Sequence, residues 1–368
     1  MPKNVKDIET LGEIVRLAHD ALDQNAWDYL IGGSETETSV LRNRLALDEL
    51  AFRPRVLVDV RNIDITKRFL DFSLRMPVIL GPIGGLEMFD PGGAATVAKA
   101  ARAFGVTSMV SSVGQPGMEE TVRQSEADLI FQLYVRGDED WVKDHIRRAE
   151  DIGYKAFCLT VDTAVYSRRE RDKIKDFNPR AGRKQLRPEF QAAFDWAHVA
   201  KIRERCTMPL ILKGIATHED ARLAIEHGID AVHVSNHGGR QLDHGRGMME
   251  ALPEIADAVG GKAAIIIDGS FCRGSDVLKA LALGADVVAL ARLYGWGLAA
   301  GGQAGVERVL ELLEIELQTD MALLGVTGLD QLGPEFIAKS RAVRRPGLFS
   351  AFPHLHIPEY DYSRHVLE

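Results

Sequence analysis

The segment Ala231–Asp243 (AVHVSNHGGRQLD) carries two side chains suited to handling a small anion. A short apolar run ends in Ser235-Asn236-His237, two glycines follow, and Arg240 lies three residues after His237. A histidine can take up a proton near neutral pH, and an arginine can hold a carboxylate through two parallel hydrogen bonds. Turns are commonly built from glycine and polar residues, so this segment alone also fits an ordinary turn.

The elements that would position these residues form a regular alternation. Eight short apolar runs, most of them rich in Val and Ile, predict buried parallel strands. These runs are Met76–Ile83, Val106–Ser112, Leu129–Val135, Ala156–Asp162, Pro209–Ile215, Ala231–Asn236, Ala264–Ser270 and Asp286–Leu293. Helical spacing of apolar residues appears between most of them, at Gly92–Phe104, Glu139–Ile152, Trp196–Arg205, His218–His227, Met248–Val259 and Ser275–Leu283. The alternation predicts an α/β fold of the (β/α)₈ (TIM) barrel type. A doubly wound sheet is the alternative, but no GxGxxG follows the first strand.

We expect residues 1–368 to form a single domain. Residues 5–50 show helical spacing and form an N-terminal helical segment, the barrel spans about 76–325, and a C-terminal tail spans about 326–368. The longest interruption of the βα spacing, Ser167–Asp195, is charged and lies on the strand-end side of the barrel, which makes it a candidate lid.

Composition excludes several classes of protein. The net charge of −8 argues against a nucleic-acid-binding surface, and Cys158, Cys206 and Cys272 form no pair typical of a disulfide or metal site. We see no apolar run long enough for a membrane span, no signal-peptide core at the start and no peroxisomal signal at the end. These features predict a cytoplasmic protein with no stable membrane insertion.

Polar residues end most of the predicted strands, where barrel enzymes carry their chemistry. They are Gln132, Tyr134, Thr160, Asp162, Lys213, His237, Arg240, Asp268, Arg273 and Arg292. Each could singly be a helix cap or a rim charge. Together they are costly to bury unless a ligand compensates their charge. The ends of strands seven and eight, Asp268–Gly274 (DGSFCRG) and Ala291–Gly295 (ARLYG), also fit a phosphate site, because glycine lets backbone N–H groups approach an anion.

Over nearly its whole length the chain resembles the FMN-dependent α-hydroxy-acid oxidases and dehydrogenases, which include glycolate oxidase, lactate oxidase and mandelate dehydrogenase. The resemblance is carried by SNHGGRQLD, FQLYV (Phe131–Val135), LTVDT (Leu159–Thr163), SRRERD (Ser167–Asp172), PLILKG (Pro209–Gly214) and KALALGAD (Lys279–Asp286). It implies FMN as cofactor, oxidation of an (S)-2-hydroxy acid to the 2-oxo acid, and oxygen, a quinone or a cytochrome as electron acceptor. It also implies a homo-oligomer, either a tetramer or an octamer.

The resemblance implies a role for each matched residue. His237 would act as the base, Asp162 would stabilise its cation, Tyr134 would bind the substrate hydroxyl, and Lys213 would stabilise the reduced flavin. The substrate carboxylate would be bound by Arg169, Arg240 and Tyr29. The remaining cofactor-binding residues would be Pro82, Ile83, Gly84, Ser111, Gln132, Thr160, Ser235, Asp268, Gly269, Ser270, Arg273, Ala291 and Arg292.

Departures from the family pattern bear on affinity and substrate. Cys272 stands where an arginine usually meets the phosphate; Arg273 and Arg292 remain, so we expect flavin to bind with weaker affinity. Ala291 replaces a usual glycine before Arg292. Gly84 and Val113 stand where relatives carry larger residues, so the substrate pocket is expected to admit bulky or aromatic, mandelate-like acids. Refilling of that space by Met88 or Met118 is the competing interpretation.

Other functions remain open at the level of sequence. The substrate could be a small acid of the lactate or glycolate type. The barrel could bind a phosphate ligand without redox chemistry, as an isomerase does, or it could bind flavin without catalysing a reaction.

Overall fold

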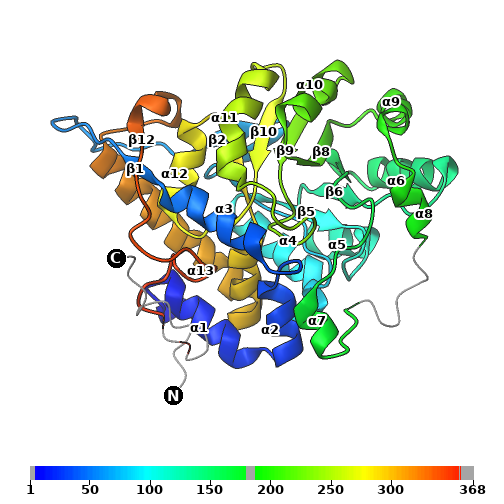
Figure 1. Cartoon of the computed structure of the whole chain (residues 1–368), viewed down its shortest axis with the longest axis horizontal. Helices are drawn as coiled ribbons and strands as arrows, with labels where there is room; N and C mark the ends of the chain where they lie inside the picture. Colours follow the sequence, from blue (N-terminus) through cyan, green and yellow to red (C-terminus); the bar gives the residue numbers. More distant parts are fainter. Residues whose placement is uncertain (1–4, 180–186, 356, 358–368) are drawn as a thin grey trace.

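Eight parallel strands close into a barrel in the computed structural model, which describes residues 5–179, 187–355 and 357 (Figure 1). The strands are β4 (Val78–Leu80), β5 (Thr107–Ser111), β6 (Ile130–Leu133), β7 (Ala156–Thr160), β8 (Leu210–Ile215), β9 (Ala231–Val234), β10 (Ala264–Ile267) and β11 (Val287–Leu290). They pair in chain order, and β11 closes the barrel on β4. The predicted (β/α)₈ barrel is confirmed, and each strand lies inside its predicted run.

The lower part of the barrel interior is apolar and closed at one end. Inward-facing residues such as Ile130, Cys158 and Ile211 form a separate core cluster. The hairpin β2 (Lys67–Phe69) and β3 (Phe72–Leu74) packs its aromatic side chains onto this cluster. Strands of three residues carry too little alternation to be predicted, so the sequence did not indicate this plug.

The outer layer contains the six predicted helices and two more. The predicted ones are α4 (Gly93–Phe104), α6 (Glu139–Asp151), α9 (Trp196–Arg205), α10 (His218–Glu226), α11 (Met248–Val259) and α12 (Gly274–Ala282). The additional ones are α5 (Met118–Ser125) and the long α13 (Arg292–Leu324), which is kinked at Gly301 and Gly302. The sequence did not predict these two helices, because α5 has few apolar residues and α13 begins with a glycine-rich stretch, so neither shows a clear helical spacing of apolar residues.

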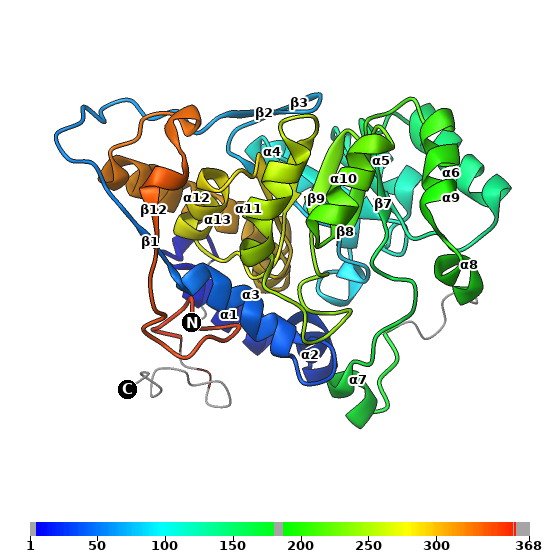
Figure 2. The ribbon, with the colours of Figure 1, turned by 45° about the horizontal axis from the view of Figure 1, so that its top comes forward.

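The N-terminal segment is helical as predicted, with α1 (Leu11–Ala21), α2 (Gln24–Ile31) and α3 (Thr38–Asp48). The N-cap residues Thr10 and Asp23 accept hydrogen bonds from the first turns of α1 and α2 and fix where these helices begin. Figure 2 shows α2 beside α7 (Glu170–Ile174), the first helix of the segment between β7 and β8; α8 (Pro188–Ala192) is the second. The N-terminal helices therefore extend the strand-end side of the barrel.

Short elements complete the chain. β1 (Leu50–Phe52) pairs antiparallel with β12 (Ile337–Lys339), and the 3₁₀ turns are Val5–Asp7, Leu86–Met88, Leu329–Gln331 and Pro334–Phe336. Parts of the predicted lid (180–186) and tail (356 and 358–368) lie outside the described residues, as do residues 1–4. That residues 1–368 form one domain stays a prediction. Within the described part of the chain, no helix is long and apolar enough to cross a membrane.

Candidate active site

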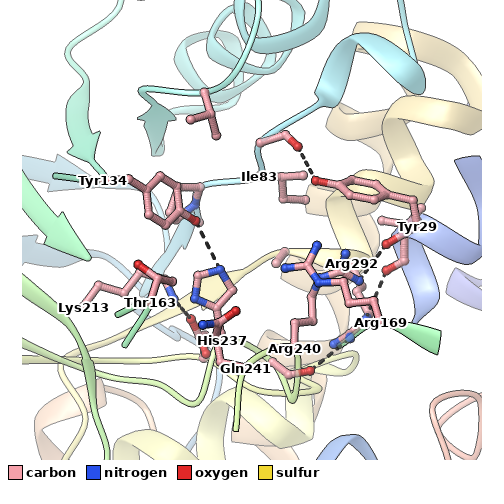
Figure 3. Close-up of a pocket in the computed structure, with 18 of the residues that line it drawn as sticks. Tyr29, Ile83, Tyr134, Thr163, Arg169, Lys213, His237, Arg240, Gln241 and Arg292 are labelled. Atoms are coloured by element: carbon pink, nitrogen blue, oxygen red, sulfur yellow. Dashed lines mark hydrogen bonds and ion pairs between the residues drawn. The ribbon is translucent and has the colours of Figure 1, made fainter. Parts of the chain in front are cut away.

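His237 lies between the Asp162 carboxylate and the Tyr134 phenol at the strand ends, and Figure 3 shows its contact with Tyr134. Its Nδ1 is 3.0 Å from Asp162 Oδ1, and its Nε2 is 3.2 Å from the Tyr134 hydroxyl. The turn after β9 gives His237 a φ of 59°, a left-handed conformation that costs energy for a residue with a side chain. Such strain is typical of a position where the direction of the side chain matters more than local stability.

The surroundings of His237 favour a neutral imidazole that is ready to accept a proton. Burial lowers its pKa below the ordinary value, and the Asp162 carboxylate partly opposes this. With Asp162 accepting from Nδ1–H, the free lone pair is on Nε2, which faces the cavity beside Tyr134. Burial raises the pKa of Tyr134 to about 12, so its hydroxyl keeps its proton and serves as a donor.

Three arginines from separate elements converge near Tyr29 of α2 (Figure 3). Arg169 precedes α7, Arg240 follows the His237 turn, and Arg292 begins α13. Burial and mutual repulsion lower the pKa of Arg240 to about 9 and that of Arg292 to about 10. Arg169 Nε is buried and has no hydrogen-bond partner among the described residues. Uncompensated cations at one place create a site for an anion.

Lys213 belongs to a compact polar group at the ends of β8 and β10. Its Nζ is 2.7 Å from Ser235 Oγ and 3.0 Å from Asp268 Oδ2. Burial disfavours its ammonium form, but Asp268 and Asp162 together with Tyr134 outweigh this effect and hold the pKa of Lys213 above its usual value. The lysine is therefore a permanent positive charge at the base of the cavity.

One cavity joins these groups and contains most of the predicted site residues. Those that line it are Tyr29, Pro82, Ile83, Gly84, Val113, Tyr134, Arg169, Lys213, His237, Arg240, Asp268, Gly269, Ser270, Ala291 and Arg292. Ser111, Gln132, Thr160, Asp162 and Ser235 end strands or follow them without lining the cavity, and Asp162 and Ser235 hydrogen-bond to the lining residues His237 and Lys213.

The polar atoms around the cavity suit a flavin. Gln132 Nε2 donates to Thr160 Oγ1 at 2.8 Å, whereas Gln132 Oε1 is buried without a partner in the described structure. Ser270 Oγ is buried and unpaired in the same way. Buried polar atoms are nearly always satisfied, so these two indicate a polar ligand that contacts both the barrel centre and the loop after β10. FMN has a polar ring edge and a phosphate and fits both places.

The loop after β10 differs from expectation at Arg273. Arg273 pairs with Glu316 of α13 at 2.7 Å and donates to the Ala351 carbonyl, and it does not line the cavity. In this structure the ion pair with Glu316 directs the Arg273 side chain away from the cavity, and its role at the phosphate stays a prediction. Cys272 does line the cavity as a buried thiol whose pKa burial raises to about 12, so it adds no charge there.

Arg292 and the helix that it begins remain available for a phosphate. Its guanidinium donates to the carbonyls of Leu30, Gly32 and Gly238. The N-terminus of α13 directs backbone N–H groups and a partial positive charge toward the cavity. A buried ion pair between Arg44 and Asp276, 2.7 Å long, braces the loop from behind.

The segment after β7 is fastened over the cavity by side chains that the sequence did not single out. Arg171 of α7 donates to both carboxylate oxygens of Glu37, at 2.6 and 2.8 Å, and reaches Asp28 of α2 at 3.3 Å. On α8, Gln191 lines the cavity and donates to Thr163 Oγ1 at 2.9 Å. These partners lie far apart in sequence, so no local pattern signals them.

The expected open space beside Gly84 is filled. A Cβ at position 84 would lie 2.5 Å from Val113 Cγ2, so valine occupies the volume that glycine releases. The prediction that both residues enlarge the pocket is corrected, because Val113 fills the space that Gly84 leaves open. Phe89 and Arg136, which sequence reasoning missed, also line the cavity.

Comparison with known proteins agrees with this geometry. A family model of the FMN-dependent dehydrogenases matches residues 18–339. Glycolate oxidase of Spinacia oleracea is 36% identical, over 92% of this chain and 100% of that protein, and L-lactate oxidase of Nostoc sp. is 36% identical, over 89% and 97%.

Solved structures with the same fold include a mandelate oxidase in complex with (S)-2-phenylpropionate. It has a TM-score of 0.84 and 36% identity, and the match covers 91% of this chain and 99% of that one. A soluble mutant of the membrane-associated (S)-mandelate dehydrogenase of Pseudomonas putida has a TM-score of 0.85 and 33% identity, over 91% and 100%. The chain thus belongs to the FMN-dependent dehydrogenase family, together with the 2-hydroxy-acid oxidases and dehydrogenases, and its cofactor is FMN.

Proposed function

We propose that this protein oxidises (S)-2-hydroxy acids with bulky or aromatic side chains, such as mandelate, to the 2-oxo acids. The observation that carries the proposal is the position of His237. Its Nε2 shares a cavity with Arg169 and Arg240, so a base faces the place where a carboxylate would be held. A 2-hydroxy acid has its hydroxyl group one carbon away from its carboxylate, which matches this pairing.

The residues divide the reaction between them. Arg169 and Arg240 bind the carboxylate and fix the direction of the Cα–H bond. His237 Nε2 accepts the hydroxyl proton, Asp162 stabilises the resulting imidazolium, and Tyr134 donates to the substrate oxygen. FMN, when bound, would supply the acceptor for the two electrons that leave the substrate. Lys213 stabilises the negative charge that then develops beside it.

The preference for a bulky side chain rests on the apolar part of the cavity wall. Ile83, Phe89, Val113, Val165 and Tyr166 contribute apolar or aromatic surface there. Burying a phenyl ring against such a wall is more favourable than burying hydrogen or methyl, by about 0.8 kcal/mol per methylene-sized group. The similarity to mandelate oxidase and mandelate dehydrogenase structures supports this choice. The similarity to glycolate and lactate oxidases supports small acids as the second candidate.

Anaerobic bleaching of the flavin by glycolate, lactate, phenyllactate and each enantiomer of mandelate tests the proposal. We expect (S)-mandelate or phenyllactate to give the highest second-order rate constant for bleaching. In Val113→Trp this advantage should shrink, whereas the rate with lactate should change less. A wild-type ranking headed by glycolate would contradict the substrate assignment, and no bleaching by any 2-hydroxy acid would contradict the reaction.

The electron acceptor is tested by admitting air to the reduced protein. Rapid recolouring identifies an oxidase, and slow recolouring that a quinone or a cytochrome accelerates identifies a dehydrogenase. We further propose a cytoplasmic homo-oligomer, a tetramer or an octamer, which analytical ultracentrifugation of the holoenzyme checks.

A further inference from the structure

A second histidine, His233, lies inside the barrel beside the Lys213 group. It is on β9, two residues before Ser235, so both side chains are on the inner face of the strand. Its neighbours across the sheet are Lys213 on β8 and Ile266 on β10. Its side chain is 0% exposed and does not line the cavity, and its Nε2 lies 3.1 Å from Asp268 Oδ2.

His233 is not satisfied as a neutral side chain. Its Nε2 contacts the Asp268 carboxylate at 3.1 Å, and its Nδ1 has no hydrogen-bond partner within the described part of the chain. An apolar residue would suit a purely structural position at this depth better, since Ile211, Ile266 and Ala231 surround the barrel axis nearby. The contact with Asp268 becomes stronger when the imidazole carries a positive charge.

The charges that face His233 keep it neutral while Lys213 satisfies Asp268. Asp268 on β10, Lys213 on β8 and Asp162 after β7 are the charged groups that act on it. Burial lowers the pKa of His233, Lys213 lowers it further, and the two carboxylates oppose this. Lys213 Nζ is 3.0 Å from the same Asp268 oxygen, so the lysine and the histidine compete for one negative charge.

We propose that His233 binds one proton from solvent each time the cofactor accepts two electrons. Two electrons taken up together with one proton would leave the cofactor with one negative charge near Lys213, which attracts the ammonium away from Asp268. Asp268 is then free to stabilise a cation on His233. The added negative charge is balanced by one proton, and no bond other than N–H forms. Asp268 lines the cavity and offers the path by which the proton reaches the ring.

His233 would thus be a positioning residue that acts through Asp268 and Lys213. The inference rests on FMN as the cofactor and not on the identity of the substrate. The test reduces the flavin without substrate, so its result can be interpreted even if the proposed substrate is wrong.

The experiment measures the midpoint potential of the flavin between pH 5.5 and 9 by photoreduction against a reference dye. His237→Asn is used as the background, because His237 also titrates in this cavity. Lys213 and Tyr134 lose their protons above this range, since the pKa of each is raised. Over part of the range we expect the slope of potential against pH to double, from one to two protons per two electrons.

His233→Gln in the same background is the matched control, because the amide can still contact Asp268 but cannot take up the proton. It should restore the single-proton slope over the whole range. A double slope that persists in His233→Gln would overturn the proposal. A single-proton slope throughout in the His237→Asn protein would also overturn the proposal. If His233→Gln does not fold, His233→Asn takes its place, because its amide likewise cannot take up the proton.

Discussion

The Cγ2 atom of Val113 occupies the space into which a side chain at Gly84 would project, 2.5 Å from where its Cβ would lie. The two positions therefore behave as one unit of the cavity wall. Gly84 does not have a positive φ, so an alanine there would be opposed by Val113 and not by the backbone.

Gly84→Ala should lower the free energy of unfolding by about 1–3 kcal/mol, which is typical of overpacking. Val113→Ala removes Cγ2, so the double variant should recover most of this loss. Urea unfolding of the FMN-saturated protein measures the coupling. Gly117→Ala is the control, since a Cβ there meets nothing within 4 Å. If the changes in unfolding free energy of Gly84→Ala and Val113→Ala simply added in the double variant, steric contact between the two positions would not be the cause of the destabilisation.

The acid limb of kcat/KM should fall below the ordinary pKa of histidine. The neutral form of His237 is the active one, and burial lowers its pKa, so activity is retained at pH 7 and lost as the pH falls through the lowered value. In Asp162→Asn the opposing carboxylate is gone, so the limb should move to still lower pH and the rate should drop.

His237→Asn should reduce flavin reduction by about 10²–10⁴-fold while FMN stays bound, as expected for loss of a general base. Rapid-mixing absorbance under anaerobic conditions measures the rate. The exposed His198, replaced by Asn, serves as the control. For the pH profile of the wild-type enzyme, an acid limb of kcat/KM above the usual pKa range of histidine would contradict the account of His237 given above.

Arg169→Met should raise KM and lower kcat together, by about 1.5–3 kcal/mol in kcat/KM, because a charge-assisted hydrogen bond to the substrate carboxylate is lost. The adjacent Arg168 is exposed and does not line the cavity, so Arg168→Met should leave both constants unchanged. Steady-state kinetics with the best 2-hydroxy acid checks both variants. Equal effects at the two positions would show that net charge, and not a carboxylate clamp, is responsible.

Arg171→Met should raise KM more than it lowers kcat, because it releases α7, and with it Arg169, from Glu37 and Asp28. The pair is partly exposed, so the expected effect is about 1 kcal/mol, roughly fivefold in KM. Glu37→Gln should add little when Arg171 is already replaced. The exposed Lys173 on the same helix provides the control substitution, Lys173→Met. If the effects of Arg171→Met and Glu37→Gln on KM were fully additive, the Arg171–Glu37 ion pair would not be what holds α7 in place.

The sequence by itself determined the barrel and the chemistry at its strand ends. Eight runs rich in branched apolar residues predict buried parallel strands, and the polar residues that end them meet because parallel strands share one carboxyl edge. His237, Arg240, Lys213 and Asp268 were identifiable in this way. His233 could have been found from the same pattern, since it is two residues before Ser235 on one strand face.

Tertiary structure decided what depends on partners that are distant in the chain. Glu316 directs the Arg273 side chain away from the cavity, Glu37 holds Arg171 through an ion pair, and Val113 fills the space beside Gly84. The direction of a charged side chain is determined by the strongest hydrogen-bonding or charged partner within reach. Packing between elements decides which partner that is, and local sequence spacing does not show it. For this reason residue type and position predicted which side chains could form the site, and only the folded arrangement showed which of them reach it.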